Sequence, residues 1–415
     1  MKENIVKIQG FAIAVIAFVV GLAMMSGDST LATPMIRNIL PIPNYLSFLC
    51  ILLCLVADNK TFKVSSLLIV LFLFYWILQT FHTYYKYSPP ILQFSTVLLF
   101  LFSCICTKSL QYGYKVYKVF LVLMTIGGIV AYLSYIFSIG LPYSIEPYYS
   151  RDGLTGWSYI NYKFAYIVLD FRGLRLCGLF NEPGLFGTIL ALVLIADKLN
   201  YKKIDNIVLF IGGILSFSLA FFLLIFIAIL LILHQRGIKP KYIVYCILTI
   251  IVIAIALPVL VEKNEMVAYL VDRMNFEDGV LAGDNRTNDV FDLYFQQMFS
   301  DGKFLFGYGH GFNSFTEAGG LSYKKVVIEY GIIGVTILWG LLLAEALKRN
   351  KHNKMGLMFI VCFFASIYQR PSVLSLNYFL ILFGGIAYIH SLTEKDVNND
   401  SVVMKKKHEK INYSK

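Results

Sequence analysis

Residues 175–196 have the sequence RLCGLFNEPGLFGTILALVLIA, an apolar run long enough to cross a membrane that nevertheless contains an arginine, a glutamate and a proline. A carboxylate at the centre of a bilayer costs about 2.5–3.5 kcal/mol even on lenient insertion scales. Arg175, Leu179 and Glu182 are spaced so that they would share one face of a helix. Pro183 lacks a backbone donor and is expected to kink that helix. The run therefore predicts a transmembrane helix with a polar feature built into it.

The composition of the whole chain shows that this run is one of many. The 415 residues are 58% hydrophobic and 15% charged, whereas a soluble domain is about 25% charged. Apolar runs recur along almost the entire length, which predicts an all-α polytopic integral membrane protein. We expect about twelve transmembrane helices, at residues 8–26, 39–57, 66–82, 91–106, 119–141, 176–197, 205–217, 219–234, 242–261, 323–347, 355–369 and 375–392.

The seventh and eighth spans are predicted as two helices because residues 204–234 would form a single helix of about 46 Å, well beyond the ~30 Å hydrocarbon core. The sequence SFS at 216–218 predicts the turn between them. With twelve spans both termini are cytoplasmic, and most Lys and Arg then fall in cytoplasmic segments, which is the positive-inside pattern. This pattern explains the net charge of +11, so no nucleic-acid partner is implied.

Two stretches between spans, both predicted on the outer side, are much longer than the others. They divide the chain into N-terminal membrane helices (1–141), a first periplasmic loop (142–175), core membrane helices with the Glu-Pro motif (176–261), a large periplasmic loop (262–322), C-terminal membrane helices (323–392) and a basic cytoplasmic tail (393–415). The positive-inside rule does not govern loops of this length. Their basic residues therefore invite a separate explanation.

Arginines and aromatic residues occur together in both long loops. The first loop contains Arg172 and Arg175, and the second contains Arg273 and Arg286. Aromatic faces suit sugar rings, and arginine forks suit phosphate oxygens. The alternative is an aromatic belt at the membrane interface with solvated charges. The combination favours a site for a phosphorylated glycan.

Within the second loop, residues 288–300 have apolar side chains at helical spacing, which predicts an amphipathic helix on the membrane surface. Arg286 lies at its start, where a helix N-terminus and an arginine would bind an anion, although it could equally be an exposed residue beside a helix cap. The following sequence FGYGHGFNS, at 306–314, contains glycines suited to tight turns. His310 in this sequence is either a polar turn residue or a functional group facing the same compartment as the arginines.

Two polar features in the last spans fit the same picture. Tyr330, in VVIEYGIIG, lies near the outer end of the tenth span, and Arg370, in SIYQRPS, lies at the outer end of the eleventh. Arg370 is either a snorkelling residue or part of the basic rim. Glu182 is either half of a structural ion pair with an arginine such as Arg175 or a carboxylate that acts on an acceptor hydroxyl.

Taken together, these motifs resemble the O-antigen polymerases of the Wzy type. The stretch RLCGLFNEPGLFG is similar to their Arg-x-x-Gly-x-Phe-x-Glu-Pro signature, and GDNR, FGYGHG, EYGIIG and YQRP follow in the same order. The resemblance covers roughly residues 120–390. This family belongs to a wider group with the O-antigen ligases and shares features with GT-C glycosyltransferases, so the resemblance implies a GT-C-like membrane fold.

The resemblance implies a metal-independent glycosyl transfer, without a cofactor, at the periplasmic face of the bacterial inner membrane. A growing glycan would leave undecaprenyl pyrophosphate and join a lipid-linked repeat unit for lipopolysaccharide synthesis. The catalytic residues would be Glu182, His310 and Arg286. The residues that bind pyrophosphate or glycan would be Arg172, Arg175, Arg273, Arg286, Tyr330 and Arg370. A polysaccharide chain-length regulator would be a protein partner.

Two other functions remain open from the sequence. An O-antigen ligase would move finished polymer onto the lipid A core, and it shares the histidine in the outer loop, so only the Glu-Pro signature favours the polymerase. A flippase for lipid-linked oligosaccharides also needs buried charges. Transporters, however, often show an internal repeat, and no second Glu-Pro half occurs in this sequence.

Overall fold

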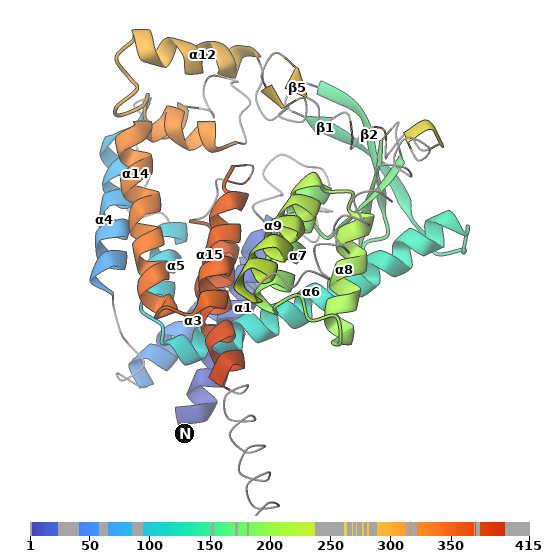
Figure 1. The fold of residues 1–415 in the computed structure, drawn as a ribbon, viewed down its shortest axis with the longest axis horizontal. Coiled ribbons are helices and arrows are strands. Elements are labelled where there is room, and N and C mark those ends of the chain that lie inside the picture. The colour runs from blue at the N-terminus through green and yellow to red at the C-terminus, as the bar shows by residue number, and fades with distance from the viewer. Residues whose placement is uncertain are drawn as a thin grey trace, which may run out of the picture.

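The structure is a computed structural model. It describes residues 2–23, 41–57, 65–84, 94–150, 153–170, 173–180, 182–236, 261–263, 268, 271, 276–277, 280–281, 289–312, 316, 322–368, 370 and 374–394. Helices make up most of the described part, and a small sheet and one crossing helix lie together at one end of them (Figure 1). This end is called the sheet end below. The N-terminus lies at the opposite end.

Four described helices are long and apolar enough to cross a membrane. They are α1 (Lys2–Ala23), α6 (Thr107–Ile136), α14 (Tyr323–Asn350) and the C-terminal run Leu376–Glu394, which begins with α16 (Leu376–Phe379) and the π turn η2 (Leu380–Gly384). Shorter apolar helices pack around them: α3 (Pro41–Ala57), α4 (Ser66–Phe81), α5 (Phe94–Ser103), α7 (Pro183–Ala196), α8 (Ile204–Leu215), α9 (Leu219–Arg236) and α15 (Lys354–Ser366). The chain therefore has the character of an α-helical membrane protein. The predicted span at 242–261 lies outside the described residues, apart from its last one.

The predicted break at 216–218 is confirmed. Helix α8 ends at Leu215 and α9 begins at Leu219, and Phe217 between them has a left-handed φ of 45°. Helix α8 has 12 residues, about 18 Å, and is too short to cross a bilayer alone.

The first long loop is where the all-α prediction is wrong. Its residues form a four-stranded antiparallel sheet with the order β1-β2-β3-β4. The strands are β1 (Ser144–Ser150), β2 (Gly153–Asn161), β3 (Tyr166–Asp170) and β4 (Gly173–Gly178). Alternating side chains cover both faces. Ile160, Ile167 and Leu176 join the main helical core, while Tyr159, Tyr166, Val168 and Cys177 form a second cluster on the other face. Aromatic and β-branched residues favour this half-buried pleat.

The same strand corrects the expectation for the Glu-Pro run. Arg175 lies in β4, paired with Val168, and the chain turns before α7 begins at Pro183. Arg175, Leu179 and Glu182 therefore do not share a helix face. Pro183 does not kink a helix either, because it occupies the first helical position, where a missing N–H costs nothing. Glu182 occupies the N-cap position, the last residue before this helix.

The predicted amphipathic helix is confirmed as α12 (Asp289–Ser300), which lies across the ends of α4 and α14 (Figure 1). Its buried face, with Phe291 and Met298, packs on Ile328 and Val335 of α14. Two short paired strands, β5 (Phe276–Glu277) and β6 (Val280–Leu281), precede it. The large second loop is thus anchored on the membrane helices through an apolar cluster of its own.

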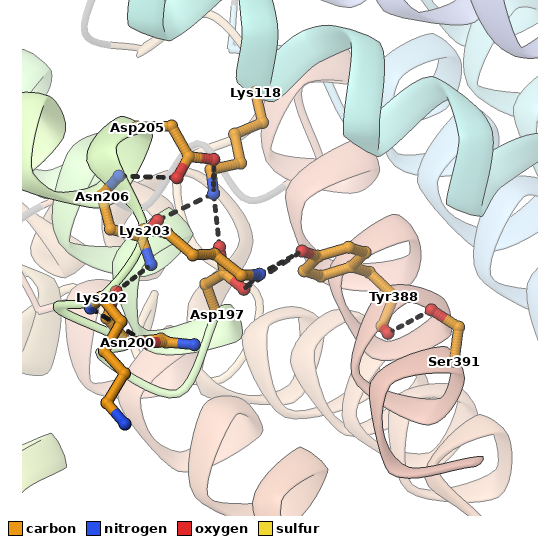
Figure 2. Close-up of polar contacts among 9 residues, drawn as sticks. All are labelled: Lys118, Asp197, Asn200, Lys202, Lys203, Asp205, Asn206, Tyr388 and Ser391. Carbon is orange, nitrogen blue, oxygen red and sulfur yellow. Dashed lines mark hydrogen bonds and ion pairs between the residues drawn. The ribbon is translucent and has the colours of Figure 1, made fainter. Parts of the chain in front are cut away.

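A buried ion network joins α6, the start of α8 and the C-terminal run (Figure 2). The ammonium of Lys118 on α6 donates to Asp197, to Asp205 (2.6 Å) and to Asn206 (2.7 Å), so its three protons are all used. Asp197, which follows α7, also accepts from Lys203 (2.6 Å) and from the hydroxyl of Tyr388 (3.1 Å) in the C-terminal run. The carboxylate of Asp197 thus accepts hydrogen bonds from three side chains.

Two lysines balance two aspartates in this network. A closed, neutral and fully paired set of this kind leaves no charge for a ligand, so it acts as a clamp between α6, α7, α8 and the C-terminal run.

Candidate functional site

The side chain of Glu182 makes an ion pair with Arg370. A guanidinium nitrogen of Arg370 donates to the carboxylate of Glu182 at 2.7 Å. Glu182 adopts an extended backbone (φ −140°, ψ 126°) and does not cap its own helix with its side chain. Its carboxylate therefore stands at the positive end of the α7 dipole and beside a cation, and both favour the ionised form. This brings together two residues that sequence analysis had placed in separate spans.

Arg370 is the more deeply buried partner, with its side chain 10% exposed against 32% for Glu182. Burial alone would lower the pKa of Arg370, but the carboxylate of Glu182 raises it above its ordinary value, so the side chain remains a cation. Its Nε and second Nη are buried and find no hydrogen-bond partner among the residues that the structure describes. Buried donors are nearly always paired, so these two nitrogens can bind an acceptor that the described residues do not supply.

Arg175 has a different position from the one expected for a phosphate ligand. It is 5% exposed, and its guanidinium donates to the carbonyl oxygens of Ser216 (3.3 Å) and Phe217 (3.2 Å). These carbonyls end α8, where a cation interacts favourably with the helix dipole. Arg175 therefore links the α8–α9 turn to strand β4.

A second polar group forms where α14 is broken at Gly331, whose φ of 65° and ψ of 179° are not helical. In an unbroken helix, Ile332 and Ile333 would donate to Ile328 and Glu329. Here residues 304–309, from the second long loop, insert between these donors and acceptors. The exchanged bonds run from Ile332 N to Phe304 O (3.0 Å), Ile333 N to Leu305 O (3.2 Å), Tyr308 N to Ile328 O (2.8 Å) and Gly309 N to Glu329 O (2.9 Å).

Glycines make this insertion possible. A Cβ on Gly331 would lie 2.3 Å from the carbonyl oxygen of Leu305, and one on Gly307 would lie 2.6 Å from the backbone of Glu329. Gly307 and Gly309 have positive φ angles (76° and 110°), as the sequence predicted for this turn. The loop and the helix thus approach at backbone distance.

The insertion brings His310 onto Tyr330. The Nδ1 of His310 lies 2.7 Å from the hydroxyl of Tyr330, and the two rings stack at 10° with centroids 6.0 Å apart. Glu329, buried in the same break, has its carboxylate 4.0 Å from that nitrogen. Burial lowers the pKa of His310, and the charge of Lys325 lowers it further. At neutral pH this histidine is uncharged and able to take up a proton.

His82 is a member of this group that sequence analysis missed. Its ring Nε2 donates to the carbonyl of Phe306 (2.7 Å), while its own backbone carbonyl accepts the N–H of His310 (2.8 Å). Tyr84 N donates to His310 O at 3.2 Å, and Thr83 forms a parallel bridge with His310. A histidine just past the end of an apolar helix carries no local signal of such contacts, because the partner residues lie in a distant segment.

The two groups belong to the same end of the molecule. The start of α14 contacts the end of α15 through stacked Tyr323 and Tyr368 rings (5.5 Å between centroids) and a bond from Tyr323 N to Tyr368 O (3.4 Å). Arg370 lies two residues after Tyr368 in the chain, so its pair with Glu182 is near the start of α14. The arrangement offers a cation for an anionic ligand and a neutral imidazole for a proton.

Three of the predicted site residues belong to the part of the chain that the structure does not describe. Arg172, Arg273 and Arg286 lie outside the described residues, so their positions relative to the two groups stay predictions. Within the described residues no three His, Cys, Asp or Glu side chains converge as metal ligands would.

No family model, no curated protein and no solved structure matches this chain. The class that the fold itself supports is a mostly helical membrane protein.

Proposed function

We propose that the chain is a polymerase of lipid-linked glycans in the bacterial inner membrane, with the sheet end facing the periplasm. It transfers a growing glycan from undecaprenyl pyrophosphate to a lipid-linked repeat unit. The observation that carries this proposal is the buried cation of Arg370, held by Glu182 and left with two guanidinium nitrogens unpaired among the described residues. A pyrophosphate supplies the oxygens that such a fork binds.

The chemistry balances without a metal. The bond between the donor sugar's anomeric carbon and the pyrophosphate oxygen breaks, and an acceptor hydroxyl forms the new glycosidic bond. The hydroxyl proton passes to His310, and undecaprenyl pyrophosphate leaves with the bonding electrons. Arg370 stabilises the charge that develops on the leaving group. Arg172, Arg273 and Arg286 are proposed to add to this binding, and Tyr330 is proposed to orient His310.

In this proposal Glu182 positions Arg370 and does not act as a base. Its carboxylate is already engaged by a cation and stabilised by the start of α7, so its affinity for a proton is reduced. The neutral imidazole of His310 is the better proton acceptor at neutral pH. A chain-length regulator and membrane lipids are the proposed partners.

The test is a lipopolysaccharide gel from a deletion strain complemented with wild type, Glu182→Gln or Arg370→Lys. Deletion should leave the core with a single repeat unit, and wild type should restore the ladder. Arg370→Lys keeps the charge but loses the planar fork, and should lower polymer about a hundredfold. Arg349→Lys is the control, because Arg349 is paired with Glu345 near the opposite end of α14.

The other outcomes assign the other functions. Bare core with accumulated lipid-linked polymer would identify a ligase. Lipid-linked single units retained on the cytoplasmic leaflet would identify a flippase. A normal ladder in the deletion strain would overturn the proposal altogether.

A further inference from the structure

Residues 303–306, within the second long loop, consist of an exposed lysine, Lys303, followed by three apolar residues beside the membrane helices. Leu305 is 49% exposed and Phe306 is 62% exposed. Exposed side chains of this size in an outer loop would ordinarily meet water. Their surroundings indicate that they face lipid instead.

The backbone carbonyls of this segment are paired within the protein, and the N–H of Lys303 donates to Met298 O (3.0 Å). All four carbonyls of residues 303–306 accept hydrogen bonds from within the protein, from Gly307 N (2.6 Å), Ile332 N, Ile333 N and the ring of His82. Irregular backbone is tolerated at hydrocarbon depth only where its polar groups are satisfied by protein or face a water-filled cavity.

The exposed side chains continue the apolar faces of two neighbouring helices. Phe81, at the end of α4, is 73% exposed, and Ile332 and Ile333 of α14 are 38% and 36% exposed. Helices α4 and α14 lie side by side (Figure 1). On α4 the exposed residues Leu73 and Ile77 precede Phe81 at intervals of one turn. These surfaces form one band with residues 305 and 306.

The depth of the contact on α14 follows from helix geometry. Helix α14 has 28 residues, about 42 Å, so about 6 Å would project beyond each side of a ~30 Å core. Ile332 lies about 13 Å from the first residue of the helix. The loop is therefore bonded to α14 about 7 Å inside the hydrocarbon boundary. Lys324 and Lys325, at the helix start, fall at the headgroups.

We propose that residues 303–306 form a re-entrant segment whose Leu305 and Phe306 side chains are embedded in the hydrocarbon of the leaflet at the sheet end. His82 is bonded to the last of these residues and holds His310. Gly309, beside His310, is bonded to Glu329, about 9 Å from the first residue of α14, so the segment sets His310 about 3 Å inside the hydrocarbon boundary, next to the headgroups of lipid-linked substrates. The inference is independent of the proposed reaction, because its test measures depth and not catalysis.

The experiment is site-directed spin labelling in phospholipid vesicles. A nitroxide is attached at Phe306→Cys in a chain freed of its seven native cysteines, and its collisions with oxygen and with a water-soluble nickel chelate are compared. Oxygen collisions should exceed those with nickel several-fold at 306, as at the positive control Phe81→Cys. Asp301→Cys, two residues before the segment and exposed, should show the reverse. A label at 306 that collides with nickel as often as the one at 301 overturns the proposal.

A second measurement covers the case in which the cysteine-free chain does not fold. A photoreactive benzoylphenylalanine replaces Phe306 or Asp301 in the native chain, reconstituted with phospholipid of known mass. Illumination should give a phospholipid adduct at 306 and little at 301, detected by mass spectrometry. Equal adducts, or none at 306, would contradict the embedding.

Discussion

The backbone carbonyl of His82 accepts the N–H of His310, and the ring of His82 holds the carbonyl of Phe306. His82, the residue after α4, therefore binds both ends of the loop 306–310 that inserts into α14. The first four helices, which carry none of the sequence motifs, thus contribute to the candidate site. The geometry gives His82 a positioning role with testable consequences.

Replacing His82 by alanine removes the ring's bond to Phe306 and leaves the backbone contact in place. We expect slower polymerisation of lipid-linked repeat units by the purified protein, by several-fold, since one such bond is worth about 0.5–1.5 kcal/mol. His82→Gln retains an N–H donor and should recover much of the rate. His234→Ala, at an exposed position of α9, should behave as wild type. A glutamine variant no better than the alanine variant would argue against positioning.

Gly331→Ala tests the break in α14. The new Cβ would lie 2.3 Å from the carbonyl oxygen of Leu305 at a φ of 65°, so we expect a loss of at least about 2 kcal/mol. Thermal unfolding in detergent, followed by tryptophan fluorescence, measures the change. Gly340→Ala is the matched control on the same helix, because nothing lies within 4 Å of its Cβ. The control should match or slightly exceed wild type, and an unchanged melting temperature for Gly331→Ala would be inconsistent with the docked loop.

Asp197→Asn tests the ion network of Figure 2. The change leaves Lys118 and Lys203 without their shared carboxylate, and Lys118 is only 7% exposed. Breaking a buried pair costs about 3–5 kcal/mol, so the melting temperature should fall markedly. Glu3→Gln breaks the exposed pair with Lys7 and should change it little. Comparable effects of the two variants would mean that the network contributes no more than a surface pair.

The same network predicts a pH dependence. Burial alone would raise the pKa of Asp197, but bonds from Lys118 and Lys203 outweigh it and hold the pKa below its ordinary value. Its stabilisation is therefore present above about pH 4 and is lost as the pH falls through the lower folded value. Wild type should lose more stability than Asp197→Asn in acid unfolding. Parallel acid transitions for the two proteins would contradict this assignment.

Lys325→Met should shift the acid limb of the polymerisation rate to higher pH. Burial lowers the pKa of His310 first, and the charge of Lys325 lowers it further, so removal of that charge raises it. The carboxylate of Glu329 near His310 is present in both proteins and does not cause a difference. Lys324→Met is the control, because Lys324 is paired with Asp292 at 3.5 Å. A limb that stays in place, or moves to lower pH, would exclude His310 as the titrating base.

Local features of the fold could be predicted from the sequence. The apolar helices, the turn at 216–218 and the amphipathic helix at 288–300 follow from hydrophobic spacing and length, which are properties of neighbouring residues. The positive φ angles of Gly307 and Gly309 follow from glycine's lack of a side chain. Each of these features is encoded where it occurs.

The start of α7 is also encoded locally, by the proline at its first position, although the sequence analysis placed a helix across it. The residue before a proline disfavours helical backbone, so Glu182 had to be extended and Pro183 had to begin a helix. The spacing of Arg175 and Glu182 suggested a shared helix face instead, but helical spacing applies only within one helix, and a strand and a turn separate these residues.

Contacts between distant segments were beyond local reasoning. The pair of Glu182 and Arg370 joins residues separated by 188 positions, and His82 gains its role only through the packing of α4 on α14. Tertiary packing also turned the first loop into a sheet, since its strands are stabilised by a helical core that no single strand reveals.

The bonds exchanged between α14 and its inserted loop impose a rule on changes in chain length. The carbonyls of Phe304 and Leu305 and the amides of Tyr308 and Gly309 each meet a particular turn of the helix. One residue inserted between Leu305 and Tyr308 would move half of these bonds out of register, as a slipped strand does in a sheet. This outer segment is therefore as intolerant of insertions and deletions as a central β-strand.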